Sequence, residues 1–173
     1  MSEKPFLLLD VDGPLNPWAA SNRGLPKNFR QWRIDGYKVR LARWHGERLR
    51  SLTDVFDLVW CTTWEHQANT DIGPRIGLDK LPVIEFGKFL PKEPPVPGLH
   101  WKTAVITAYS IAHQRPFAWV DDEVDPVKDG MYFMQWGGHP FLTMKIDPST
   151  GLEEKHFVEL REWAEEVRNG TEG

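Results

Sequence analysis

Residues 7–17 read LLLDVDGPLNP, and this stretch decides the fold. Three leucines in a row are typical of a strand buried on both faces, and Gly13-Pro14 marks the turn that ends it. Two carboxylates, Asp10 and Asp12, stand where this buried strand must stop. They indicate a site that needs charge at the end of the strand; the alternative is that they only end the strand and cap the turn.

The composition is that of an ordinary globular protein. The chain has 173 residues, of which 40% are hydrophobic and 27% charged, enough for a single domain over residues 1–173 with a sizeable core. The single cysteine, Cys61, excludes an internal disulfide framework and suits a reducing cytosol. Because we find neither an apolar stretch of membrane length nor a signal peptide, we expect a cytoplasmic protein that does not bind membranes. The sequence indicates no protein partner.

Strand-like and helix-like segments alternate along most of the chain. Besides the strand at 5–10, we expect strands at 57–63, 81–86, 116–122 and 141–147. We expect helices at 46–56, 64–73, 100–114 and 152–169, the second of them broken by Gly73-Pro74. This alternation predicts a three-layer α/β/α sandwich around a mainly parallel, Rossmann-like sheet.

Residues 14–45 interrupt this alternation with a predicted β-hairpin flap that turns at Asp35-Gly36. Nine basic and two acidic residues lie between Arg23 and Arg50, although the whole chain carries a net charge of −4. Such a block predicts a polyanionic partner; the alternative is a solvated basic arm without a partner. The candidate contacts to a polyanion flank the turn: Arg30, Arg33, Lys38 and Arg40.

Polar side chains gather where the predicted strands end. Asp10 and Asp12 follow the first strand, Thr62 and Thr63 the second, and Asp121 and Asp122 a third, with Lys102 at the start of a helix. Ligands of such sheets bind beyond the carboxyl ends of the strands. Carboxylates this close repel one another, and Mg²⁺ relieves the repulsion while leaving places for water and phosphate. The pattern predicts a Mg²⁺ site beside a bound phosphate group.

These motifs resemble the haloacid dehalogenase (HAD) superfamily, in its phosphatase type without a cap domain. The segment DVDGPLN, the strand-end threonine, the helical lysine and the segment WVDDEVD occur in the family's order, over roughly residues 5–147. Response-regulator receivers share the strand-end acids, but their lysine comes last. The resemblance implies a HAD-type fold and a Mg²⁺-dependent phosphomonoesterase, a hydrolase that acts through an aspartyl-phosphate.

The resemblance also implies roles for the first motif. Asp10 is the expected nucleophile and a metal ligand. Asp12 is expected to protonate the leaving oxygen and then to activate water, while its backbone carbonyl contacts the metal. The family often has Thr or Val two residues after the acid/base residue, and this chain has Pro14 instead. The proline removes a backbone donor from the turn that can hold the acid/base residue in place.

Further roles follow for the other motifs. Thr62 is expected to bind a phosphate oxygen, with Thr63 as a helper. Lys102 is expected to neutralise charge in the transition state. Asp122 is the expected direct metal ligand with Asp121 behind it, although the sequence leaves the order of these two open.

The substrate is expected to be large. Residues 14–45 and 65–101, the two places where relatives carry a cap, are too short for a cap domain, so the crevice stays open. Together with the basic hairpin, this favours a phosphorylated nucleic-acid end or a nucleotide, with Trp18 or Trp64 stacking on a base. The alternatives are a small phosphorylated metabolite, transfer of the phosphoryl group to another acceptor, and a non-catalytic phosphate-binding protein.

Overall fold

A four-stranded parallel sheet forms the centre of the molecule. The computed structural model describes residues 3–21, 24–25, 27–89 and 97–170. The sheet has the order β4-β1-β5-β6 and consists of β1 (Phe6–Leu9), β4 (Asp57–Trp60), β5 (Phe117–Asp121) and β6 (Phe141–Lys145). The runs of apolar residues that predicted these strands are almost completely buried in β1, β4 and β5.

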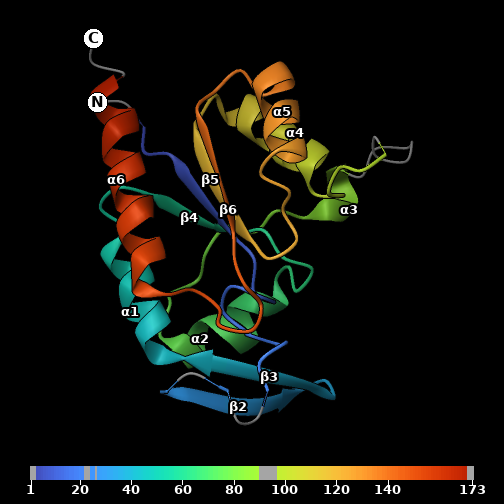
Figure 1. Ribbon diagram of the computed structural model, residues 1–173, viewed down its shortest axis with the longest axis vertical. Helices are drawn as coiled ribbons and strands as arrows, with labels where there is room; N and C mark the ends of the chain where they lie inside the picture. Colours follow the sequence, from blue (N-terminus) through green and yellow to red (C-terminus); the bar gives the residue numbers. More distant parts are fainter. Residues whose placement is uncertain (1–2, 22–23, 26, 90–96, 171–173) are drawn as a thin grey trace.

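Helices cover both faces of this sheet, which confirms the predicted three-layer architecture (Figure 1). Alternate residues of each strand point to opposite faces, so Leu7 and Leu9 enter one core while Phe6 and Leu8 enter the other. The first core packs against α1 (Arg43–Ser51) and α6 (Glu154–Gly170), and the second against α4 (Thr103–His113) and α5 (Lys128–Trp136).

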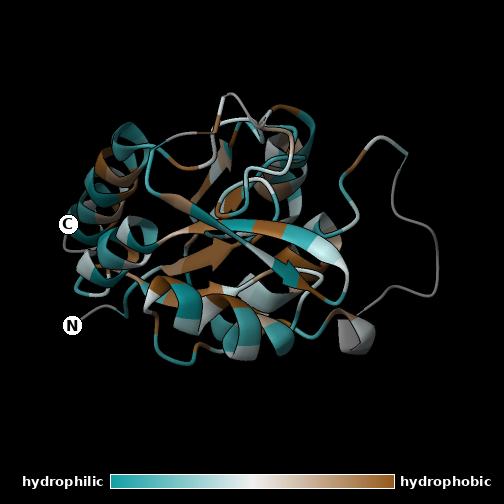
Figure 2. Ribbon diagram, turned by 90° about the horizontal axis from the view of Figure 1, so that it is seen from below, coloured by the Kyte–Doolittle hydropathy of each residue, from teal (hydrophilic) through white to brown (hydrophobic). Residues whose placement is uncertain are grey.

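The predicted hairpin is confirmed and lies beyond the carboxyl edge of the sheet (Figure 1). It pairs β2 (Phe29–Ile34) with β3 (Tyr37–Ala42) in antiparallel register. Its turn residues Asp35 and Gly36 have φ angles of 49° and 84°, the conformation for which an Asp-Gly pair is favoured. Viewed from the hairpin side, the hydrophobic strands of the sheet lie behind it (Figure 2).

Two sequence predictions about secondary structure are wrong. Residues 81–86 do not form a strand: Val83 makes a single bridge to Trp60, because Pro82 lacks the N–H that would extend the ladder. Gly73-Pro74 does not end a helix but begins α2 (Gly73–Ile76), after a π-helical turn, η1 (Ala68–Ile72). Proline fits the first turn of a helix, where its missing N–H has no partner to lose.

Two helices were not expected from the sequence. One is the short α3 (Phe86–Phe89), and the other is α5, which follows the WVDDEVD segment. Arg23, one end of the basic block, lies outside the described residues. None of the helices in the described ranges combines the length and the apolar character needed to cross a membrane.

Candidate active site

Three strand-end motifs meet at the ammonium group of Lys102. This lysine directly precedes α4, and its Nζ lies 2.9 Å from Asp10 Oδ2 and 2.7 Å from Asp121 Oδ2. It also donates a hydrogen bond to the backbone carbonyl of Cys61 at 3.1 Å. All three charged side chains are buried. The ends of β1, β4 and β5 are therefore joined by one buried cation, as the strand-end pattern predicted.

Burial controls the charges at this site. It raises the pKa of Asp10 to about 7, with Asp121 adding to the rise and Lys102 opposing it. Burial also opposes the charge of Lys102, but the carboxylates beside it outweigh this effect and hold its pKa above the ordinary value. The thiol of Cys61 has a raised pKa because it is fully buried, so it is a neutral packing residue and not a nucleophile.

The carboxylates fit a magnesium ion. Asp10, Asp121 and Asp122 each offer a carboxylate oxygen, and these atoms lie within 4.8 Å of one another. Burial and the charge of Asp121 raise the pKa of Asp122, against the hydrogen bond from Trp18, so a cation here would relieve a real electrostatic cost. Because all the ligands are oxygens, the set suits Mg²⁺.

Gly13 brings the first motif close to this carboxylate cluster. A Cβ atom at Gly13 would lie 2.4 Å from Cβ and Cγ of Asp122, and the φ angle of Gly13 is +92°. Both features require glycine. The DVDGPLN turn can therefore lie directly against Asp122.

Two N–H donors fix the carboxylate of Asp12. Asn16 Nδ2 donates to its Oδ1 at 2.8 Å, and the indole N–H of Trp64 donates to its Oδ2 at 2.9 Å. The turn around Pro14 closes without a proline N–H, because Leu15 and Asn16 both donate to the carbonyl of Val11. Asp12 is thus held in place despite the departure at Pro14.

The two threonines after β4 have different surroundings. Thr62 is fully buried, and its hydroxyl accepts a hydrogen bond from the backbone N–H of Trp64 at 3.3 Å. Thr63 is exposed and lines two cavities beside Asp12. Of the pair, Thr63 is the one that faces the open space at the site.

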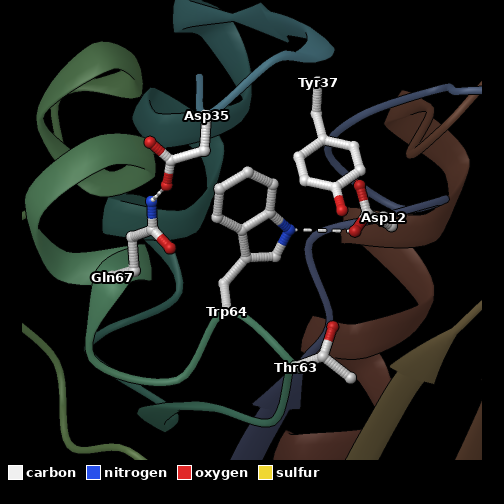
Figure 3. Close-up of a pocket in the computed structure, with 6 residues that line it drawn as sticks. All are labelled: Asp12, Asp35, Tyr37, Thr63, Trp64 and Gln67. Carbon is white, nitrogen blue, oxygen red and sulfur yellow. Dashed lines mark hydrogen bonds between the residues drawn. The ribbon is translucent and has the colours of Figure 1, made fainter.

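Two cavities share Asp12 and Thr63 as a common wall. The motif cavity, about 220 Å³, is lined by Asp10, Asp12, Trp18, Thr63, Trp101, Lys102, Asp122 and Glu123. The hairpin cavity, about 370 Å³, is lined by Asp12, Asp35, Tyr37, Thr63, Trp64 and Gln67 (Figure 3). The motif cavity contains the predicted catalytic groups, and the hairpin cavity opens on the other side of Asp12.

Both predicted stacking tryptophans also act as hydrogen-bond donors. Trp64 binds Asp12 as described, and the indole N–H of Trp18 donates to Asp122 Oδ2 at 3.0 Å. Trp18 lines the motif cavity, and Trp64 lines the hairpin cavity. The two indoles therefore orient a carboxylate each while their rings remain at the cavity walls.

The four basic residues of the hairpin are not equivalent. The Arg40 side chain is buried and donates to the carbonyl of Ala20 and to Gln31 Oε1, which fits a role in holding the hairpin. Arg33 donates to the carbonyl of Gly36, and Arg30 is exposed; neither lines a cavity at Asp12. Lys38 is exposed and lines a third cavity with Asp12 and both Trp18 and Trp64.

Sequence reasoning missed Asn16, Tyr37 and Gln67, and it gave no site role to Asp35, Trp101 and Glu123, which also line the cavities. Asn16 lies four residues after Asp12 in the same turn, so its contact was the most accessible to prediction. Tyr37 and Gln67 reach the hairpin cavity from β3 and from the turn before η1. Their approach depends on how the hairpin packs, which no local pattern records.

At the carboxyl edge of the parallel sheet lie an aspartate pair, a strand-end threonine, a helical lysine and a second aspartate pair. This arrangement is that of a hydrolase of the HAD superfamily. Over residues 6–157 the chain matches the family described as the HAD domain in Swiss Army Knife RNA repair proteins, and it belongs to that family. Searches of curated proteins and of solved structures returned no match.

Proposed function

We propose that the protein is a Mg²⁺-dependent phosphomonoesterase that forms an aspartyl-phosphate on Asp10. The observation that carries this proposal is the buried ammonium of Lys102 between Asp10 and Asp121, at the wall of the motif cavity. Asp10 Oδ1 accepts a hydrogen bond from the N–H of Val11 at 2.7 Å, so the carboxylate has a fixed orientation. A fixed nucleophile and a fixed cation are the groups that phosphoryl transfer needs.

The reaction then proceeds in two displacements at phosphorus. An oxygen of Asp10 attacks, the bond to the leaving oxygen breaks, and Asp12 gives that oxygen a proton. In the second step Asp12 takes a proton from water, whose oxygen attacks phosphorus and releases Asp10 and inorganic phosphate. Lys102 neutralises the charge of Asp10 and of the phosphoryl oxygens throughout.

Asp10 and Asp122 are the residues that would hold Mg²⁺, together with the backbone carbonyl of Asp12. When bound, the ion supplies positive charge to the phosphoryl oxygens. Asp121 would act behind them, because it is fully buried and, unlike Asp10 and Asp122, does not line the motif cavity. Thr63, exposed at the cavity, and the buried Thr62 behind it are the candidate partners of a phosphate oxygen.

The substrate we favour is the phosphorylated end of a nucleic acid. The family to which the chain belongs is described as a domain of RNA repair proteins. The cavities around Asp12 adjoin one another, and Lys38 stands beside them for a neighbouring backbone phosphate. Arg30 and Arg33 are exposed on the same hairpin and can follow a longer strand.

Phosphate release in the presence of Mg²⁺ tests both parts of this proposal. The substrates are a small aryl phosphate and oligonucleotides phosphorylated at either end, assayed at two salt concentrations. We expect turnover that EDTA abolishes and Mg²⁺ restores, and a kcat/KM for oligonucleotides that falls with salt. Asp10→Asn should keep the fold and lose activity by several orders of magnitude, because the nucleophile acts as part of a unit.

The other outcomes identify the alternatives. Full activity in folded Asp10→Asn protein would exclude the covalent mechanism. Turnover of aryl phosphate without a preference for oligonucleotides would favour a small phosphorylated metabolite. Binding of phosphorylated ligands without any turnover would leave a non-catalytic phosphate-binding protein.

A further inference from the structure

The hairpin cavity lies where the leaving group of the proposed reaction must go. Asp12 protonates the leaving oxygen, so the part of the substrate attached to that oxygen has to lie next to Asp12. On one side of Asp12 is the motif cavity with Asp10 and Lys102, which the phosphoryl group occupies. On the other side, across the shared wall of Asp12 and Thr63, is the hairpin cavity.

We infer that the hairpin cavity binds the nucleoside that carries the phosphate, with its base against the rings of Trp64 and Tyr37. This inference rests on the proposed esterase reaction, and it adds the part of the substrate that the protein recognises. It assigns a binding role to Tyr37, Asp35 and Gln67, three residues that take no part in the chemistry.

The aromatic groups of the cavity are arranged to receive a planar ring. The indole N–H of Trp64 is fixed on Asp12 at 2.9 Å, so the orientation of its ring is set before a ligand arrives. The side chain of Tyr37 also lines this cavity and is 69% exposed, so its ring is accessible to a ligand. Figure 3 shows the Trp64 ring between Tyr37 on one side and the Asp35–Gln67 pair on the other.

The polar groups of the cavity suit a sugar or the edge of a base. Gln67 Nε2 donates to Asp35 Oδ2 at 2.6 Å, which fixes both side chains. No described residue donates to the other oxygen of Asp35 or to the amide oxygen of Gln67, so both can accept from a hydroxyl or an amino group of the ligand. Asp35 is itself held by the tight Asp-Gly turn of the hairpin.

The same lining argues against other ligands. Among the described residues no basic side chain lines the hairpin cavity, so a second phosphate has no partner there. An alkyl chain would cover the second carboxylate oxygen of Asp35 and the amide oxygen of Gln67 without giving either a hydrogen bond. The volume of about 370 Å³ is in the range of small-ligand sites, and a base stacked on an aromatic side chain contributes about 1–3 kcal/mol.

The test compares a dinucleotide, phosphorylated on its terminal nucleoside, with the same molecule lacking that base. In the wild type we expect the intact dinucleotide to have the higher kcat/KM, by about 10- to 100-fold. Tyr37→Ala should remove most of this preference, whereas Tyr37→Phe should keep it because the ring remains. Trp136→Ala is the matched control, since Trp136 is similarly exposed on α5 and lines none of the cavities around Asp12.

A binding measurement separates this inference from the proposed reaction. Asp10→Asn protein is titrated with both fluorescent dinucleotides, which needs no turnover. Tighter binding of the intact dinucleotide, lost in the Tyr37→Ala double variant, supports the nucleoside site even if no phosphate is ever released. Equal binding and equal turnover of the two dinucleotides, with the wild type still hydrolysing them, overturns the inference and leaves the esterase. A preference for a phosphopeptide over both also overturns it.

Discussion

Asp121 and Asp122 are neighbours in the chain but occupy different surroundings. Asp121 is fully buried and is bonded to Lys102 and to the N–H of Glu123. Asp122 is half-buried, lines the motif cavity and accepts a hydrogen bond from the indole N–H of Trp18. Side chains of successive residues at a strand end point in different directions, which explains the difference.

This difference predicts how the two residues share the work of binding Mg²⁺. Asp122→Ala should raise the Mg²⁺ concentration for half-maximal activity more than about 100-fold, because a direct ligand is lost. Asp121→Ala should raise it by about 10- to 100-fold, the usual effect of removing a group behind the ligands. Titration of activity with Mg²⁺ measures both, and the reverse order would exchange the two assignments.

The residues that the sequence identified are those whose position depends on their own strand. Asp10, Asp12 and Asp122 could be placed because each follows an apolar run at a known edge of the sheet. The contacts of Trp18 and Trp64 with these carboxylates could not, because each indole reaches its partner from a loop that folds back over the motif. The sequence predicts that Arg40 contacts substrate. Its side chain is instead buried and donates hydrogen bonds to Gln31 and to the carbonyl of Ala20, so it holds the hairpin in place.

Among the elements, α1 makes a close contact that depends on one glycine. A Cβ atom at Gly46 would lie 1.8 Å from the carbonyl oxygen of Ile76 in α2. The Gly46→Ala substitution therefore forces the two helices apart and should lower the free energy of unfolding by about 1–3 kcal/mol, the usual cost of overpacking.

Gly130→Ala in α5 is the matched control for this prediction. A Cβ atom there would meet only the ring of Phe141 at 3.7 Å, an ordinary contact. Alanine is the better helix former, so this variant should gain up to about 1 kcal/mol. Urea denaturation of both variants is the measurement, and equal stability of the two would contradict the close α1–α2 contact.

The elements were predictable wherever one local signal decided them. The apolar runs located the four strands of the sheet, and Asp35-Gly36 located the hairpin turn. The two wrong predictions, at 81–86 and at Gly73-Pro74, have the same cause. Pro82 and Pro74 both lack a backbone N–H, and the effect depends on whether the fold needs a donor at that position. Beside Val83 a donor was needed to extend the sheet, whereas the first turn of α2 needs none.

At the scale of the whole molecule, distant segments are tied to the first motif through the backbone. The N–H of Leu152 donates to the carbonyl of Pro14 at 2.8 Å, and the carbonyl of Leu152 accepts from Nε2 of His45 in α1 at 2.9 Å. The sequence predicted the three layers, because strand-like and helix-like segments alternate along the chain. It did not predict this connection, because the sequence separation between His45 and Leu152 leaves no local pattern.

We expect protonation of His45 to lower the free energy of unfolding in acid. Its ring is buried among Phe29, Trp44 and Phe157, and Nδ1 has no hydrogen-bond partner in the described structure. Burial lowers the pKa of His45 from 6.5 to about 4, so the folded protein holds the neutral ring while the unfolded chain takes up a proton. The stabilisation is complete above pH 6.5 and is lost as the pH falls towards 4.

The loss from this one group amounts to about 3 kcal/mol of unfolding free energy. His45→Gln keeps an N–H donor for Leu152 but does not titrate. Between pH 7 and 4 the unfolding free energy of this variant should therefore fall by about 3 kcal/mol less than that of the wild type. Carboxylates titrate in both proteins, and the difference between the two curves therefore isolates His45. The measurement is urea denaturation of both proteins at several pH values from 7 to 4. Parallel curves would show that protonation of His45 does not limit the stability of the fold.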